Sequence, residues 1–414
     1  MRRGAGVFAG VAGRVIVALV AVAVLGVTGY AWYVVRHFND RLVVTDVLGP
    51  EAGGERPLDG TVDILLVGMD SRTDARGRPL SAEQRKMLRV NADEGEVNTD
   101  TIILLHVPSD TSRAVAVSIP RDSYVDIPGY GKHKINSAYQ RGRNVERERL
   151  LAAGMKPGQE LERRAHQAGA RVLLKTVEKL TGRTIDHYAS LNLLGFYDIT
   201  QAIGGVEVCL KKPVQDVKSH ADFPAGRQVI SGRDALAFVR QRHGLPRGDL
   251  DRVVRQQVFM TGLVRKMLST GTLTDPAKLN NLIEAITRSV VLSRGWDIMA
   301  FAQRMSTLSG GQVEFRTIPV GSLALPTPMD GAAVEVDPQQ VRQFIASLSE
   351  DEDGEVIPQV DASSRPPQPS SSSAPPSSAP PGDAPPSSAP PEQEQQPPVG
   401  GSEPITADEV PCVN

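Results

Sequence analysis

One stretch near the start of the chain constrains the fold more than any other, because it is too apolar to be left in water. The 21 residues from Val15 to Val35 include no charged side chain. A helix of that length rises roughly 31 Å, which matches the hydrocarbon core of a bilayer. Tyr30, Trp32 and Tyr33 lie at its far end, where amphipathic rings favour the membrane interface. The sequence therefore predicts a transmembrane helix over residues 15–35.

Positive charge before this segment predicts its orientation. Arg2, Arg3 and Arg14 precede the apolar run, and a large domain follows it. The positive-inside bias makes residues 1–14 a cytoplasmic stub and places residues from about 40 onward outside the cell membrane. The alternative is a cleaved signal peptide, but the run exceeds the usual apolar stretch of about 7–15 residues and no convincing cleavage site follows it. We expect a single-pass membrane protein with an extracytoplasmic main domain.

The other end of the chain is of low complexity. Residues 363–400 contain 13 prolines, and the sequence Ser-Ser-Ala-Pro-Pro occurs there three times. Such a segment has too few apolar side chains to compensate for the entropy lost on ordering. We therefore expect residues 351–403 to be a disordered, polyproline-like tether that leads to a short C-terminal segment, residues 404–414.

The chain has two cysteines, which are far apart in sequence. Cys209 lies in the apolar run 206–210, and Cys412 lies in the segment after the tether. Outside the membrane, two cysteines are free to pair. We predict a Cys209–Cys412 disulfide that joins the end of the chain to the main domain. The alternative is a buried free thiol at Cys209 and a frayed chain end.

Residues 60–350 are predicted to form one α/β domain, preceded by a linker over residues 36–59. Short β-branched runs alternate with helical segments, a pattern that indicates a central mixed sheet covered on both faces. The strand pair around residues 108–112 is expected to be an antiparallel hairpin, and residues 72–98 a long loop or a small helical insertion. The expected strands are Val62–Gly68, Thr101–Val107, Arg113–Ile119, Val206–Leu210 and Gln312–Val320, and the expected helices are Arg163–Leu180, Leu191–Ile203, Leu250–Leu268 and Leu282–Leu292.

Composition excludes several functions. The 46 Lys and Arg residues against 48 Asp and Glu residues leave a net charge of -2, so no basic coat for nucleic acid is present. Seven scattered histidines and two cysteines show no zinc-binding spacing. The chain also lacks a GxxxxGK[ST] phosphate-binding loop. We expect neither a nucleic-acid-binding protein nor a P-loop nucleotidase.

Two carboxylates lie where predicted strands meet loops. Asp70 follows the strand that starts at Val62, and Asp100 precedes the strand that starts at Thr101. Ligands of open α/β sheets bind at such edges. A pair of carboxylates there suits Mg²⁺ bridging to phosphate oxygens, whereas a single aspartate at a strand end can simply cap a turn. Asp70 and Asp100 are therefore candidate Mg²⁺ ligands.

Arginines interrupt apolar stretches in the second half of the domain. Arg240 and Arg242 are predicted to point the same way from an extended segment, and Arg252 and Gln256 share one helical face. Guanidinium groups bind phosphate bidentately and stay charged, so a buried anion would explain their position. Ion pairs with Asp249 and Asp251 are the alternative for Arg252 and Arg255. Arg121 joins these candidates from the end of a predicted strand.

These residues lie in motifs that resemble the LytR-CpsA-Psr family of cell-envelope ligases. The resemblance extends over roughly Asp63–Val320, and a cytoplasmic stub, one span and an external domain complete the layout. Each motif alone is too short to identify the family, but the occurrence of all of them in this order is specific for it. The motifs are Asp63–Arg72, Thr99–Thr101, Ser118–Tyr124, Lys134–Tyr139, Gly204–Val206, Ala235–Arg242 and Gly248–Gln257.

The resemblance implies a phosphotransferase with an α-β-α sandwich fold. Members move a glycopolymer from a polyprenyl-pyrophosphate carrier to peptidoglycan as a phosphodiester, and they hold the lipid in an apolar pocket. Carried over to this chain, Asp70 and Asp100 would hold Mg²⁺, and Asp122 is a candidate for removing the proton of the attacking hydroxyl. One departure is Asn98, where many members have arginine. The pyrophosphate would be bound by Arg121, Lys134, Arg240, Arg242, Arg252 and Gln256, with Arg121, Arg240 and Arg242 also stabilising the transition state.

Two other functions fit the same residues. A hydrolase would use the same metal and arginines with water as the acceptor. A non-catalytic membrane sensor would bind polyprenyl phosphates to regulate the envelope, and it would need the arginines but not Asp70 or Asp100. The sequence does not name the polymer, and we expect specificity to reside in loops such as residues 72–98 and 141–162.

Overall fold

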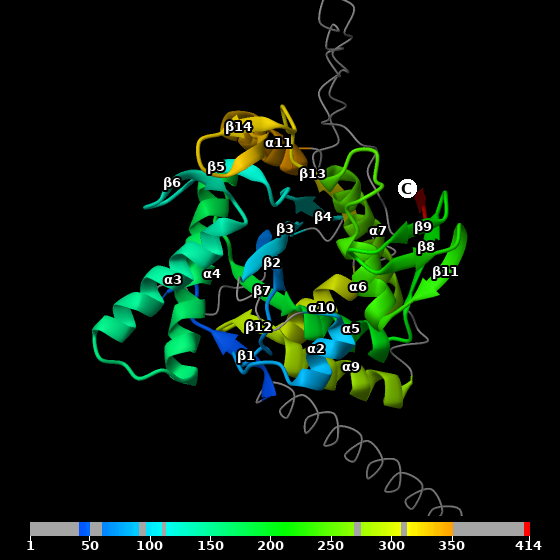
Figure 1. Ribbon diagram of the computed structural model, residues 1–414, viewed down its shortest axis with the longest axis horizontal. Helices are drawn as coiled ribbons and strands as arrows, with labels where there is room; N and C mark the ends of the chain where they lie inside the picture. Colours follow the sequence, from blue (N-terminus) through cyan, green and yellow to red (C-terminus); the bar gives the residue numbers. More distant parts are fainter. Residues whose placement is uncertain are drawn as a thin grey trace, which may run out of the picture.

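A seven-stranded mixed sheet forms the centre of the computed structural model (Figure 1). The structure describes residues 41–49, 60–90, 97–109, 113–268, 275–307, 313–350 and 410–414. Strand β2 lies in the middle, parallel to β7 and antiparallel to β3. In spatial order the strands are β1 (Val43–Thr45), β12 (Val290–Ser293), β7 (His187–Asn192), β2 (Val62–Asp70), β3 (Asn98–Val107), β4 (Ala114–Ser118) and β13 (Val313–Thr317).

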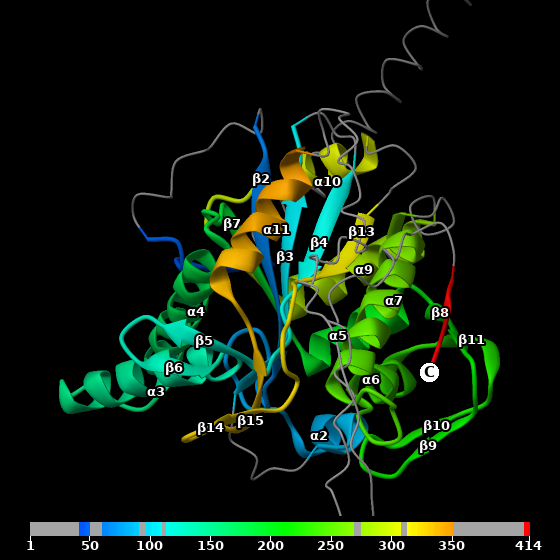
Figure 2. The same ribbon diagram turned by 90° about the horizontal axis from the view of Figure 1, so that it is seen from above.

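Helices cover both faces of this sheet, as the alternation of strands and helices predicts (Figure 2). Leu65 and Val67 of β2 face a core shared with α3, α4 and α11, whereas Val62 and Ile64 face the side of α7 and α10. This alternation follows from the two-residue period of a strand. The helices are α2 (Ala82–Leu88), α3 (Ser137–Ala152), α4 (Gln159–Thr181), α5 (Leu193–Ala202), α6 (Gly232–Arg240), α7 (Asp249–Leu268), α9 (Pro276–Ser289), α10 (Ile298–Thr307) and α11 (Pro338–Glu350).

Three small sheets extend the domain. One carries β5, from which the chain continues toward α3, and another joins the C-terminal strand β16 to β8. They contain β14 (Leu325–Thr327), β15 (Gly331–Glu335), β5 (Ser123–Ile127) and β6 (Gly131–Lys134); β11 (Gly226–Ile230), β8 (Val206–Leu210) and β16 (Cys412–Val413); and β10 (Ala221–Phe223) and β9 (Val214–Asp216).

Several sequence expectations are confirmed and others need correction. The antiparallel pairing of β3 with β4 and the end of α4 at Gly182 are as predicted. The predicted helix Leu282–Leu292 ends at Ser289, because the β-branched and apolar residues that follow form β12, which pairs with β7. The predicted linker 36–59 contains β1, whose β-branched residues pair with β12. Residues 72–98, expected to be a long loop or a small helical insertion, contain the short helix α2, as the second alternative predicts.

The structure bears on the two chain ends in different ways. The predicted span at residues 15–35 and the whole predicted tether at residues 351–403 lie outside the described residues. Within the part of the chain that is described, no helix is both long and apolar enough to cross a bilayer.

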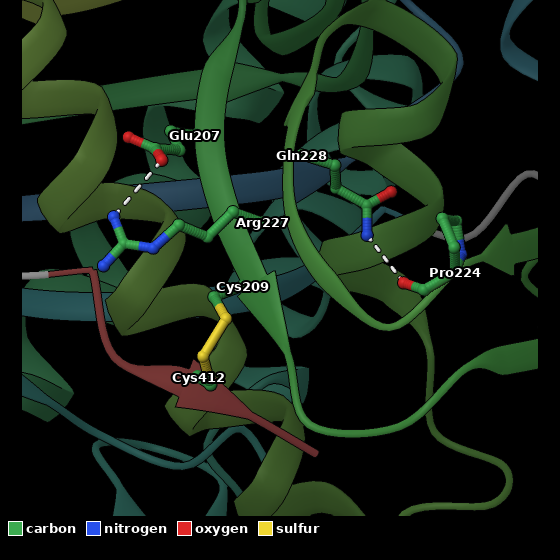
Figure 3. The surroundings of a disulfide bond; sticks show 6 residues. All are labelled: Glu207, Cys209, Pro224, Arg227, Gln228 and Cys412. Carbon is green, nitrogen blue, oxygen red and sulfur yellow. Dashed lines mark hydrogen bonds and ion pairs between the residues drawn. A yellow bond between two sulfur atoms is a disulfide. The ribbon is translucent and has the colours of Figure 1, made fainter.

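The end of the chain is bound to the domain through the disulfide that the sequence predicts. Cys412 of β16 lies opposite Cys209 of β8, and the two sulfurs are bonded (Figure 3). The Lys211 amide donates to the Val413 carbonyl at 2.8 Å, and buried Arg255 donates to the Asn414 carbonyl oxygen. The C-terminal segment is therefore an edge strand of the β8–β11 sheet.

Reducing this disulfide should destabilise the domain. Cys209 and Cys412 are 203 residues apart, so the bond closes a long loop in the unfolded chain. We expect the free energy of unfolding, measured with denaturant, to fall by about 2–5 kcal/mol in dithiothreitol. The double variant Cys209→Ala/Cys412→Ala should show the lower value with or without reductant. A wild-type protein whose unfolding is insensitive to reductant would contradict the role of the bond.

Acid should weaken the contact between α3 and α4. The Tyr139 hydroxyl lies 3.0 Å from His166 Nδ1, and burial lowers the pKa of His166 to about 4. Because the unfolded chain binds this proton near pH 6.5, stability is complete above that pH and falls by up to about 3 kcal/mol as pH drops toward 4. Unfolding curves at several pH values should show this loss, and His166→Gln should remove that part of the pH dependence.

Candidate active site

A β-bulge between β2 and β3 sets the geometry of the site. Gly68 pairs with Thr101, but the next residue, Met69, pairs with Thr99. Asp100 is therefore an extra residue without a partner on β2. Bulges of this kind change the direction of a side chain and often lie beside functional sites.

The bulge brings the two predicted carboxylates to one face of the sheet. Simple alternation would put Asp100 on the face of Ile102, which is packed in the core beneath α3 and α4. Instead, Asp100 lines the same cavity as Thr101 and Asp70. Gly68 permits this approach, since a Cβ at residue 68 would lie 2.9 Å from the Cβ of Thr101.

The cavity beside these carboxylates is about 450 Å³ and mostly apolar. It lies between the sheet and helices α5, α6 and α7, so the predicted helical segments 191–203 and 250–268 do contribute to its wall. The predicted helix at 191–203 begins at Leu193, because the Asn192 side chain accepts from the Gly195 amide and caps it. The apolar wall consists of Leu66, Ile103, Ala189, Leu191, Leu193, Phe196, Val239, Phe259, Met260 and Val290.

One end of the cavity, at the ends of β2, β4 and α6, is charged. We call it the polar end; it comprises Asp70, Asp100, Arg121, Arg240, Arg242, Arg252 and Gln256. Each arginine is held by a carboxylate. Arg121 pairs with Asp100, and Arg240 Nη2 lies 3.2 Å from Asp70.

Helix α7 supplies the most buried member of this group. Arg252, in the first turns of the helix, is 2% exposed, and its Nη2 lies 2.6 Å from Asp249. Arg242 Nε lies 3.6 Å from the same carboxylate. Gln256, one turn later, donates to the Val239 carbonyl at 3.3 Å. The shared helical face predicted for Arg252 and Gln256 is therefore confirmed.

Burial has opposite effects on the ionisation of the pair at the start of α7. Burial lowers the pKa of Arg252 to about 10, which leaves it charged at neutral pH, and raises the pKa of the Asp249 carboxyl. The Nε atoms of Arg252 and Arg121 are buried without a hydrogen-bond acceptor in the described structure. The Nε of Arg121 faces Asp122 at 3.7 Å, whereas the Nε of Arg252 has no hydrogen-bond partner in the described structure.

The polar end carries more positive than negative charge. Among the described residues, its four arginines together with Arg72 and Lys134 are ion-paired with four carboxylates, an excess of two positive charges; the carboxylates are Asp70, Asp100, Asp122 and Asp249. An uncompensated charge next to an apolar wall is unfavourable without a counter-ion. The arrangement suits a ligand with an apolar chain and an anionic head.

Not every predicted residue reaches the cavity. Asp122 Oδ1 lies 3.5 Å from Lys134 Nζ and 3.7 Å from Arg121 Nε, and neither Asp122 nor Lys134 lines the cavity. Asp122 thus orients Arg121 from behind. Arg255 contacts Gln241 and the Phe238 ring, with its guanidinium carbon 5.0 Å from the ring centre. The extended segment predicted for Arg240 and Arg242 is wrong at Arg240, which ends helix α6 because the preceding residues are buried on one helical face.

Sequence reasoning assigned no role to Arg72 and considered Asp249 only as an ion-pair alternative. Arg72 follows Asp70 by two residues, a spacing that places both on one side of an extended chain, and this was the available signal. Asn98, the departure from the family pattern, pairs in register with Asp70. Arg72 and Arg240 are therefore the cations that contact Asp70, while a neutral residue lies across the strand.

The donor set at the polar end fits Mg²⁺ as it is usually bound with phosphates. Asp70 and Asp100 offer oxygen ligands on one face, and Mg²⁺ commonly takes one or two carboxylates and completes its shell with substrate phosphates and water. No cluster of three or more His, Cys, Asp or Glu side chains suited to a metal occurs among the described residues. A metal at this site would thus depend on the ligand for part of its shell.

The fold and the site define a class: an α/β protein with an apolar cavity that ends in arginines and carboxylates. The chain belongs to the LytR_cpsA_psr family, whose model matches residues 51–349. This membership agrees with the motifs that carry the site residues.

Two known proteins are similar to this chain in sequence. The cell wall biosynthesis protein LcpA of Corynebacterium glutamicum is 48% identical over 333 residues, covering 80% of this chain and 64% of LcpA. The polyisoprenyl-teichoic acid–peptidoglycan teichoic acid transferase TagU of Bacillus cereus is 30% identical over 244 residues, 59% of this chain and 64% of TagU. The chain thus spans less than two thirds of either relative.

The fold is also found in a solved structure. TagV of B. subtilis superposes with a TM-score of 0.51 at 22% identity, covering 71% of this chain and 98% of TagV. At this level of identity the likeness concerns the fold alone. It supports the central mixed sheet with helices on both faces.

Two arginines three residues apart on α7 should behave differently when replaced. Arg252→Gln should weaken the binding of inorganic pyrophosphate by roughly tenfold or more, because a charged donor is lost from the cavity. Arg255→Gln should leave that affinity within about twofold but lower the free energy of unfolding by about 2–4 kcal/mol, because its contacts hold the chain end. Calorimetric titration and denaturant unfolding test both. Equal loss of pyrophosphate affinity in the two variants would contradict this division.

Proposed function

We propose that this protein is a phosphotransferase that moves a glycopolymer from a polyprenyl-pyrophosphate carrier to peptidoglycan. The observation that carries the proposal is the combination of a mostly apolar cavity with one end lined by four arginines. An isoprenoid chain matches the first part and a pyrophosphate the second. The names of the relatives, a cell wall biosynthesis protein and a teichoic acid transferase, support the same class of reaction.

The arginines would hold the donor and stabilise its reaction. Phosphoryl transfer depends mainly on positioning and charge neutralisation. Arg252, fixed by Asp249, and Arg121, fixed by Asp100 and Asp122, are already oriented before a ligand binds. Such preorganised donors stabilise charge that develops on the leaving phosphate.

The reaction exchanges one phosphorus–oxygen bond for another. A sugar hydroxyl of peptidoglycan attacks the phosphorus that carries the glycopolymer and forms a phosphodiester. The bond from that phosphorus to the polyprenyl phosphate breaks, and polyprenyl phosphate leaves with the electron pair. The hydroxyl proton passes to a base; Asp122 is a poor candidate, because it is engaged by Arg121 and Lys134 outside the cavity.

Asp70 and Asp100 would hold Mg²⁺ at the polar end. When bound there, the ion would neutralise phosphate charge as a Lewis acid. Arg72 and Arg240 on Asp70, and Arg121 on Asp100, would keep both carboxylates oriented. The proposal also includes the single membrane span at residues 15–35 and an extracytoplasmic domain, which would keep the enzyme beside a lipid-borne donor.

Transfer can be tested with the protein in detergent, Mg²⁺, a synthetic polyprenyl-pyrophosphate saccharide and peptidoglycan oligomers. We expect a saccharide–phosphate–peptidoglycan adduct, detected by mass spectrometry, whose formation falls at least about 100-fold in Asp70→Ala and Arg121→Ala. Arg227→Ala, an exposed arginine on β11, is the matched control and should keep full activity.

Other products would identify other functions. Free saccharide phosphate without adduct would establish a hydrolase. Binding of the lipid without turnover, unaffected by Asp70→Ala but lost in Arg121→Ala, would establish a sensor. Either result would overturn the ligase proposal.

A further inference from the structure

A second hollow of about 680 Å³ adjoins the polar end of the cavity. It lies between α2, α6 and the β9–β10 hairpin, elements that lie near one another in Figure 2. Arg240 and Arg242 line both spaces, so the two are adjacent. We call this hollow the basic groove, after the further cations that line it: Arg85, Lys86, Arg89, Lys218 and Arg233.

The basic groove concentrates positive charge in a chain whose net charge is -2. None of its five further cations makes an ion pair with a carboxylate in the described residues. The one carboxylate in the lining is Asp216, which accepts from the Ser219 hydroxyl at 2.7 Å and the Lys218 amide at 3.0 Å. Glu83 of α2 and Asp234 of α6 are exposed and do not line the groove. The groove is therefore suited to an anionic ligand.

The backbone conformation of two residues also supports a ligand-binding role for the basic groove. Arg89 and His220 are the two non-glycine residues with positive φ in the described parts of the chain, at 53° and 59°. Both line the basic groove, one from the end of α2 and the other from the β9–β10 turn. The left-handed region is unfavourable for residues other than glycine, and residues kept there cluster at functional sites. Residue 89 is thus an arginine at a position where glycine would adopt the same left-handed conformation at a lower energetic cost.

We propose that the basic groove binds the acceptor, through the carboxylates of peptidoglycan stem peptides, and so delivers its hydroxyl to the phosphorus. This inference rests on the proposed function. In an in-line displacement the attacking and leaving oxygens lie on opposite sides of the phosphorus. The leaving oxygen belongs to the lipid phosphate, whose chain occupies the apolar wall. The attacking hydroxyl must therefore arrive beyond the polar end, where Arg240 and Arg242 border the groove.

Charge favours the acceptor over the carried polymer as the occupant. Stem peptides bear free carboxylates at each repeat, so peptidoglycan is anionic along its length. The donor needs no charge beyond its pyrophosphate, which the polar end already binds. A groove lined by five cations without an ion pair to any described carboxylate therefore matches the acceptor whichever polymer is transferred.

The test compares two double variants of the whole protein. Lys86→Gln/Arg233→Gln removes two groove cations, and Lys211→Gln/Lys212→Gln removes two exposed lysines outside the groove. Transfer is measured against the concentration of soluble peptidoglycan strands and, separately, of lipid donor. We expect KM for the strands to rise roughly fivefold or more only in the groove variant, with KM for the donor unchanged. With strands whose carboxylates are amidated, the groove variant and wild type should become equal.

A single-residue variant distinguishes the loss of a groove charge from a loss of folding stability. Arg89→Gly should preserve or raise the melting temperature, because it relieves the left-handed strain, yet it should raise KM for the strands. If KM rises for the donor instead, or for neither substrate, the groove does not bind the acceptor and the inference fails while the ligase stands. Direct binding of the strands by calorimetry gives a readout without turnover. Groove-dependent binding by a protein that forms no adduct would overturn the proposed function and leave acceptor binding intact.

Discussion

Burying arginine beside an apolar wall is the constraint around which the site is built. Arg252 is almost inaccessible to water, and its charge has to be met by Asp249 and by whatever enters the cavity. Arg121 is likewise paired with Asp100, and Arg240 is paired with Asp70. Carboxylates hold the arginines in place but do not cancel their total charge, so the fold retains an affinity for anions. Under the proposed function, selectivity for an amphiphile would follow from the proximity of this charge to the apolar wall.

Much of the fold around the site could be predicted from local sequence. The strands around Asp70 and Asp100, the helix carrying Arg252 and Gln256, and the pairing of the two cysteines all depend on short-range patterns or on elimination. The family itself was recognisable because its motifs occur in order along the chain.

Other features could not be predicted because they depend on partners distant in the chain. The bulge that turns Asp100 toward the cavity exists only in the register between β2 and β3. Strand β12 was mistaken for the end of a helix, since only its pairing with β7 and β1 decides its conformation. The extended reading of Arg240 failed because the burial of α6 outweighed local preference. Sequence patterns thus located the charged residues that line the cavity better than they located the elements that form its walls.

The short strand β1 has a consequence for where the proposed reaction would take place. It begins at Val43, eight residues after the end of the proposed membrane span at Val35, and a chain of eight residues extends at most about 29 Å. β1 is hydrogen-bonded to β12, whose Val290 lines the apolar cavity. With the proposed span in a bilayer, this spacing would keep the cavity close to the membrane. A carrier lipid would then leave the membrane only in part to be bound, while peptidoglycan would have to approach the protein.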